Sequence, residues 1–187
     1  MYHEDPKIQE DHELAVLKLF TQWLASKGLP QYELVARPNP PDGILRAEPQ
    51  HLWVEIADAY RSDDEAHEER SHVTPGETPF LHREHPIMSP DARTAEAVLR
   101  EIKKKMTKES YYSAIEKYGP GVLICCERDP LFDQSTLQEI LERIELEAED
   151  LQILNKGVFK EVYLYQSPAN GRAGTFHILC VFPGSGQ

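Results

Sequence analysis

The sequence predicts a single α/β (α+β) domain over residues 1–187, in which helices cover a β-sheet. Three observations lead to this prediction. A length of 187 residues is close to that of one domain. Hydrophobic residues make up 40% of the chain, enough for a buried core. Helical and strand-like patterns also alternate, in the order helix, three strands, helix, strand, helix and two strands.

The first part of the chain predicts one helix and three strands. Residues 11–27 carry leucine and phenylalanine side chains at helical spacing, and a glycine and a proline follow as stop signals. Short runs bounded by proline and glycine predict strands at 32–37, 43–48 and 51–60. We expect these three strands to form an antiparallel meander.

The middle of the chain predicts an exposed segment and then a long helix. Residues 61–91 are rich in acidic residues and proline and lack hydrophobic periodicity, so we interpret them as an exposed excursion or flap. A helix begins at Pro90 and ends by Tyr118. Its apolar residues recur three and four positions apart, which predicts one buried face.

The last part of the chain predicts the centre and one edge of the sheet. Residues 121–127 form a continuous apolar run, which is typical of a fully buried central strand. An acidic helix with a solvated face is expected over 134–150. Strands at 161–166 and 175–182, separated by a turn-forming segment, should form a hairpin or lie side by side.

Charge and cysteine content limit the classes of function. The 32 acidic and 20 basic residues give a net charge of -12, which repels phosphate backbones at long range and argues against broad, non-specific nucleic-acid binding. No apolar run approaches the roughly 18 residues of a membrane span, and the polar amino end is unlike a signal peptide. Three cysteines, an odd number, do not suggest a disulfide framework. We therefore expect a cytoplasmic protein that is not membrane-bound.

Two carboxylates on neighbouring predicted strands are the first candidate site. Asp42 precedes the second strand and Glu55 lies within the third, so pairing of these strands would bring them together. Such oxygen ligands suit Mg²⁺ or Mn²⁺. Asp42 also fits an ordinary Pro-Asp-Gly turn, and Glu55 could instead face solvent or pair with Arg37 or Arg46.

Four features follow one another in the chain. They are an acidic residue in the first helix, the segment PPDGIL, the segment WVEIA and a lysine-bearing helix that leads into an apolar strand. Over residues 11–127 this arrangement resembles the restriction-endonuclease-like PD-(D/E)XK nuclease superfamily. The resemblance implies a restriction-endonuclease-like core with a central mixed β-sheet flanked by helices. It also implies that Asp42 and Glu55 bind the divalent ion, Mg²⁺ or Mn²⁺, and that Glu13 joins them.

The sequence departs from the family at the lysine two residues after the glutamate, where Ala57 stands. Some members of the superfamily supply this lysine from the following helix. Helical geometry favours Lys105, at the edge of the apolar stripe, and then Lys103, and it places Tyr112 in the same cleft. A solvated helix face is the alternative explanation for this lysine run.

The sequence leaves two functional hypotheses open. In the first, the protein is a metal-dependent nuclease that hydrolyses DNA phosphodiester bonds, with Asp42, Glu55, Glu13 and Lys105 as its site residues. DNA would approach residues 93–118, which hold seven basic and four acidic residues. In the second, favoured by Ala57 and the net charge, the nuclease-like fold is a catalytically inactive binding or interaction module. A homodimer could then form through an exposed strand or a tyrosine-rich helix end, Tyr111, Tyr112 and Tyr118.

Other histidines and cysteines are assigned no function. His82 and His85 lie three residues apart, as in some zinc sites, but nearby prolines argue against a helix there. His177 is interpreted as a satisfied strand histidine. Cys125 and Cys126 alternate in a buried strand, so at least one should belong to the core, and no histidine is near them in the sequence.

Overall fold

A six-stranded sheet forms the centre of the protein, which we describe from a computed structural model that covers residues 6–61, 89–127, 132–168 and 174–183. Most of the expected excursion, residues 62–88, lies outside these described residues. The strands are β1 (Glu33–Ala36), β2 (Gly43–Ala47), β3 (Gln50–Ala59), β4 (Gly121–Glu127), β5 (Phe159–Gln166) and β6 (Thr175–Val181). The helices are α1 (Pro6–Ser26), α3 (Pro90–Met106), α4 (Tyr112–Tyr118), α5 (Gln134–Leu146) and α6 (Ala148–Asn155), with a 3₁₀ turn, η1, at Glu109–Tyr111.

The strands lie side by side in chain order, and the sheet is mixed. β1, β2 and β3 are antiparallel neighbours, as the sequence predicted for a meander. β3, β4 and β5 are parallel, and β6 pairs antiparallel with β5 at the far edge. The α/β class and the central mixed sheet flanked by helices are therefore confirmed.

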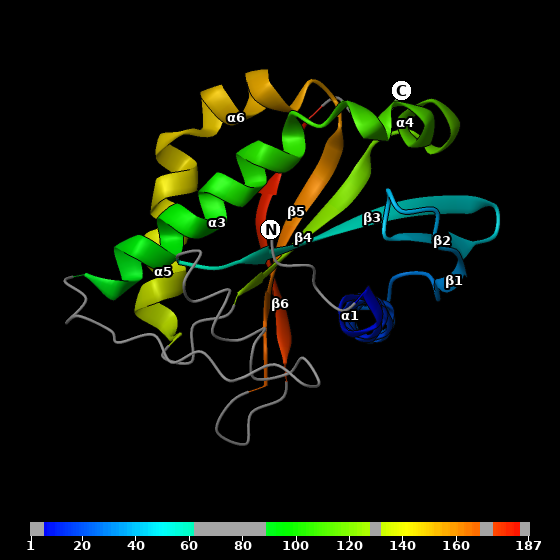
Figure 1. Ribbon diagram of the computed structural model, residues 1–187, viewed down its shortest axis with the longest axis horizontal. Coiled ribbons are helices and arrows are strands. Elements are labelled where there is room, and N and C mark those ends of the chain that lie inside the picture. Colours follow the sequence, from blue (N-terminus) through cyan, green and yellow to red (C-terminus); the bar gives the residue numbers. More distant parts are fainter. Residues whose placement is uncertain (1–5, 62–88, 128–131, 169–173, 184–187) are drawn as a thin grey trace.

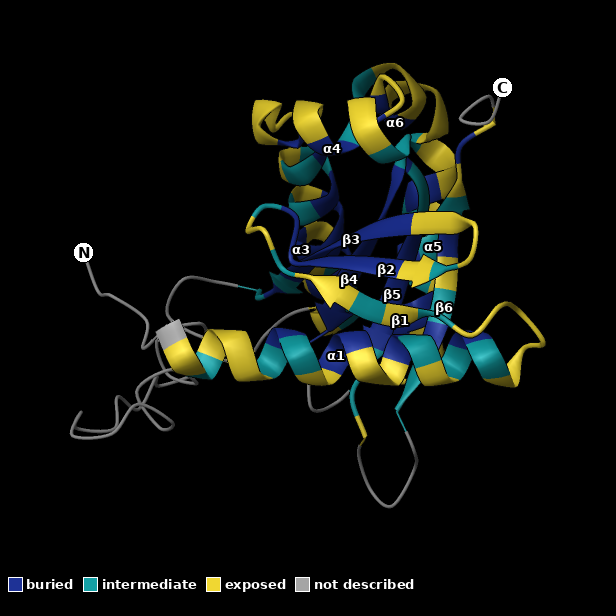
Figure 2. Ribbon diagram, turned by 90° about the vertical axis from the view of Figure 1, so that its right-hand side faces the viewer, coloured by how far each residue is buried: buried dark blue, intermediate teal, exposed yellow. Residues whose placement is uncertain are grey.

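Helices cover both faces of the sheet and create two hydrophobic cores. α1 packs on one face, and α3, α5 and α6 pack on the other (Figures 1 and 2). Alternation along β3 sends Val54 and Ile56 towards α1 and sends Trp53 and Ala57 towards α3. Because β4 lies between two parallel neighbours and is covered on both sides, all seven of its residues are buried.

Trp53 fixes the junction between β3 and the segment that enters β4. Its indole Nε1 donates a hydrogen bond to the carbonyl oxygen of Gly119 at 2.6 Å. A Cβ atom at Gly121 would lie 2.3 Å from the Trp53 ring, so only glycine leaves room for this ring.

The structure corrects two sequence-based expectations about helices. The acidic segment 134–150 is not one helix, because α5 ends at Leu146 and α6 begins at Ala148. The expected helix from Pro90 to Tyr118 is also interrupted, since α3 ends at Met106 and a 3₁₀ turn follows. No helix among the described residues is both long enough and apolar enough to cross a membrane.

The interruption after α3 makes the prediction for Tyr112 wrong. A continuous helix would have placed Tyr112 on the same stripe as Lys105. The Thr107 hydroxyl instead donates to the Lys104 carbonyl oxygen at 3.0 Å where the helix ends. Tyr112 is 67% exposed, whereas Tyr111 is fully buried.

Candidate functional site

The candidate site lies where β3 extends beyond β2. The last residue pair of the β2–β3 ladder is Gly43–Val54, and β3 continues for several residues. The Asp42 Oδ2 atom accepts a hydrogen bond from the Ile56 N–H at 2.7 Å. The Lys105 ammonium donates to the Ile56 carbonyl oxygen at 2.9 Å. Two side chains thus satisfy backbone groups that a longer β2 would otherwise pair.

Glu55 is buried beside this backbone opening. Its residue exposure is 3%, and its Oε1 atom accepts from the Lys105 Nζ atom at 2.5 Å. Its Oε2 atom is buried and has no hydrogen-bond partner among the described residues. A buried carboxylate oxygen without a hydrogen bond is costly, so Oε2 could bind a cation or accept from the Tyr111 hydroxyl, which interacts with Glu55.

Asp42 is held next to two other carboxylates. Burial, and then the negative charges of Glu55 and Glu13, together raise the pKa of Asp42 to about 7. The Ile56 N–H and the Lys105 ammonium oppose the shift but do not overcome it. The three carboxylates therefore repel one another when all are ionised, and a bound cation would reduce this repulsion.

Lys105 compensates only part of this negative charge. Burial alone would lower the pKa of Lys105, but the Glu55 and Asp42 carboxylates outweigh burial and the pKa is raised. The ammonium therefore stays protonated. The Lys108 ammonium lies 3.9 Å from Glu55 Oε1, and its pKa is lowered by burial and by the charge of Lys105.

Glu13 reaches the site from α1 but is already bound by two partners. Its Oε2 atom pairs with Arg37 Nη2 at 2.5 Å, and its Oε1 atom accepts from Gln9 Nε2 at 2.8 Å. Burial raises the pKa of Glu13, although Gln9 and Arg37 counteract the shift. Arg37 also donates to the Asp42 backbone carbonyl oxygen at 3.2 Å, so it links Glu13 to the turn that carries Asp42.

The other lysines of α3 point to different partners. Lys103 forms an ion pair with Glu147, and Lys104 pairs with Glu101 at 2.9 Å. Glu55 pairs with Lys105 rather than with Arg37 or Arg46, the arginines that the sequence offered as alternative partners. The structure thus brings Asp42, Glu55 and Lys105 together, with Glu13 flanking them.

Tyr111 is a polar group near Glu55 that the sequence did not indicate for this site. Its hydroxyl is buried and makes no hydrogen bond of ordinary length and angle among the described residues, but it is close enough to the Glu55 carboxylate to interact with it. Burial raises the pKa of Tyr111, and the Glu55 charge adds to this effect. The break in the helix after Met106 turns this side chain inward, and no periodicity in the sequence marks that break.

Mg²⁺ or Mn²⁺ fits the residues of this site. The available donors are carboxylate oxygens, which both ions prefer. Glu55 Oε2 makes no hydrogen bond in the described part of the chain, and burial together with the charges of Glu55 and Glu13 raises the pKa of Asp42, so a cation would relieve the cost of ionising both carboxyls. Asp42 and Glu55 are the residues that could hold the ion. Glu13 could join them if its carboxylate gave up its hydrogen bond to Arg37 or Gln9.

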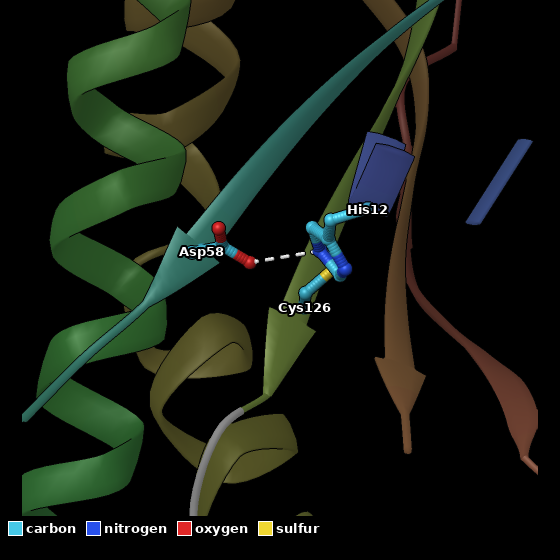
Figure 3. Close-up of side chains that lie close together, drawn as sticks. All are labelled: His12, Asp58 and Cys126. Atoms are coloured by element: carbon cyan, nitrogen blue, oxygen red, sulfur yellow. Dashed lines mark ion pairs between the residues drawn. The ribbon is translucent and has the colours of Figure 1, made fainter. Parts of the chain in front are cut away.

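A second cluster of metal-binding residue types lies on the α1 side of the sheet. His12 from α1, Asp58 from β3 and Cys126 from β4 point towards one another (Figure 3). No histidine lies near Cys126 in the sequence, so this cluster was not expected. The pairing of Asp58 with Cys126 depends on the β3–β4 register, and the approach of His12 depends on helix packing.

Comparisons with known proteins return no match. No family model, no curated protein and no solved structure matches this chain.

Proposed function

We propose that this protein is a metal-dependent nuclease of the PD-(D/E)XK type that hydrolyses DNA phosphodiester bonds. The observation that carries the proposal is the buried Glu55 carboxylate, with one oxygen on Lys105 and the other without a hydrogen-bond partner among the described residues. The nearby Asp42 carboxyl, with its raised pKa, completes a pair of ligands for Mg²⁺ or Mn²⁺. The order helix, three antiparallel strands, helix and parallel strand supports a restriction-endonuclease-like core.

Lys105 supports the proposal despite Ala57. The lysine expected on β3 is absent, but the Lys105 ammonium reaches Glu55 from α3. This ammonium has three N–H donors, of which Glu55 and the Ile56 carbonyl oxygen take two. The third can orient a water molecule or a phosphate oxygen, which is the role that the missing lysine would have.

Residues of this chain would have separate roles in hydrolysis. Asp42 and Glu55 hold the ion, and Lys105 orients the attacking water or the scissile phosphate. When bound, Mg²⁺ or Mn²⁺ supplies positive charge that stabilises the transition state of in-line attack by water. Lys108, whose side chain is 42% exposed, adds positive charge where a DNA phosphate would approach.

Two lysines of the basic patch at residues 93–118 lie near Glu55. Lys103 and Lys104 are paired with glutamates, whereas Lys105 and Lys108 surround Glu55. We therefore propose that DNA contacts the protein beside Lys105 and Lys108. Three free cysteines, two of them fully buried, fit the reducing cytoplasm that we expect for this protein.

The second candidate function is a catalytically inactive interaction module on the same fold. The net charge of -12 and Ala57 favour it. Of the three tyrosines considered for an association surface, Tyr112 is the exposed one, so a homodimer through this helix end would be centred on Tyr112. Exposed apolar side chains at Ile178 and Val181 on β6 offer the alternative strand edge.

A cleavage assay separates these two functions. Plasmid, single-stranded DNA and RNA are incubated with the full chain and Mg²⁺ or Mn²⁺, and Lys105→Met is compared with Lys104→Met, a matched control on the same helix. The nuclease proposal predicts metal-dependent cleavage of DNA that Lys105→Met abolishes and Lys104→Met retains. Absence of cleavage of all three substrates by a folded wild type would favour the interaction module.

A further inference from the structure

The residues His12, Asp58 and Cys126 form a compact cluster built from three separate elements. Asp58 and Cys126 are opposite one another in the parallel β3–β4 ladder, and the His12 side chain approaches them from α1 (Figure 3). The nearest nitrogen, oxygen and sulfur atoms all lie within 4.8 Å of one another. His12 Nε2 and Asp58 Oδ1 are 3.2 Å apart. One imidazole, one carboxylate and one thiol thus share a single small volume.

We propose that this cluster is a zinc site. Imidazole nitrogen and thiolate sulfur are the ligands that zinc prefers over magnesium, and a carboxylate is a common third ligand. Zinc bond lengths of roughly 2.0–2.3 Å place tetrahedral ligands about 3.3–3.6 Å apart. The His12–Asp58 distance already has nearly this value, and a small rotation of side chains brings in the Cys126 sulfur.

Burial and charge agree with a site that has three protein ligands. Cys126 is fully buried, whereas His12 and Asp58 have side-chain exposures of 24% and 28%. The ion would therefore enter from the His12–Asp58 side and keep its fourth position open to water. The Cys126 thiol releases its proton to solvent as the sulfur–zinc bond forms. The thiolate and the Asp58 carboxylate then balance the two positive charges of zinc.

Zinc at this position would link α1 to β3 and β4. His12 immediately precedes Glu13, and Asp58 follows Glu55 by three residues on β3. The ion would therefore anchor the α1 segment that carries Glu13 next to the carboxylate site. This site is chemically distinct from the oxygen-only site at Asp42 and Glu55, so the two inferences can fail separately.

Cobalt and zinc titrations of the metal-free full chain test the proposal. Cobalt(II) bound to a thiolate gives a near-ultraviolet charge-transfer absorption, which an oxygen-only site cannot produce. We expect one equivalent of Co²⁺ to generate this absorption and one equivalent of Zn²⁺ to displace it. Cys126→Ala should abolish the absorption, while Cys180→Ala, which removes a thiol on β6, should retain it.

A second variant covers the case in which Cys126→Ala does not fold. His12→Gln changes a half-buried residue on α1, and we expect it to lower zinc affinity by more than about a hundredfold, because loss of a mere supporting partner of a ligand costs 10–100-fold. His51→Gln, at an exposed position on β3, is its control. Equal zinc affinity in wild type and His12→Gln, or no thiolate absorption with wild type, would overturn the proposal and leave an ordinary His12–Asp58 ion pair. Asp42→Asn should retain the absorption whether or not the nuclease proposal holds.

Discussion

Replacing Asp42 by asparagine should make the metal-free protein more stable at alkaline pH. The Asp42 carboxyl is buried next to Glu55 and Glu13, and its pKa is raised from 3.8 to about 7. The folded state therefore holds the Asp42 proton more tightly than the unfolded state does. Stability from this group is fully present below pH 3.8 and is lost as the pH rises towards 7. Asparagine keeps an oxygen for the Ile56 N–H and carries no charge.

The pKa difference sets the size of the effect. Each pKa unit corresponds to about 1.4 kcal/mol, so the gain in free energy of unfolding should increase by about 1.4 kcal/mol per pH unit between pH 4 and 7. Above pH 7 the gain should level off at roughly 4 kcal/mol, since the shift spans about three pKa units. Asp42 is only 6% exposed, so solvent screening reduces this value little.

Denaturant unfolding in the presence of a chelator measures this difference. Wild type, Asp42→Asn and the control Asp150→Asn, an exposed position on α6, are compared at pH 5, 6, 7 and 8.5. We expect the stability advantage of Asp42→Asn to grow with pH and that of Asp150→Asn to stay near zero. A difference that does not change with pH, or a loss of stability in Asp42→Asn at pH 8.5, would refute the argument that Asp42 is destabilised by its neighbours.

Two further substitutions test the packing around the site. Lys105→Met should destabilise the metal-free protein by about 3 kcal/mol or more at neutral pH, because it leaves the buried Glu55 carboxylate without its cation. The exposed Lys104→Met should change the free energy of unfolding by less than about 0.5 kcal/mol, and equal effects in urea unfolding would contradict the assigned pairing. Gly121→Ala should cost about 1–3 kcal/mol in the same assay, since the new methyl group meets the Trp53 ring. A Gly121→Ala protein with unchanged stability and unchanged tryptophan fluorescence would show that the ring does not need this space.

Most of the fold could be predicted because hydrophobic periodicity follows burial. The continuous apolar run at 121–127 became the fully covered β4, and the alternation around Glu55 correctly gave the two faces of β3. Helix ends were predicted less well. Nothing in the spacing of apolar residues signals that α3 stops at Met106, because Thr107 and the following residues are compatible with a helix. The heptad extrapolation to Tyr112 failed for this reason.

The site could be predicted only where it depends on local pattern. Asp42 and Glu55 precede and occupy strands that are adjacent in the chain, so their proximity follows from a simple meander. The partner of Glu55 depended on how α3 packs against β3, and helix geometry could only rank the lysines. The cluster around Cys126 combines three distant segments, and neither its strand register nor the position of α1 is encoded in a local pattern.

Calorimetric titration of Mg²⁺ and Mn²⁺ into the metal-free protein tests the central claim most directly. We expect saturable binding by wild type and by Asp150→Asn, and no saturable binding by Asp42→Asn. We also expect saturating Mg²⁺ to stabilise wild type, by about 2.7 kcal/mol at 100 times the dissociation constant, without stabilising Asp42→Asn. Equal Mg²⁺ binding by wild type and a folded Asp42→Asn would contradict the assignment of Asp42 and Glu55 as the metal site.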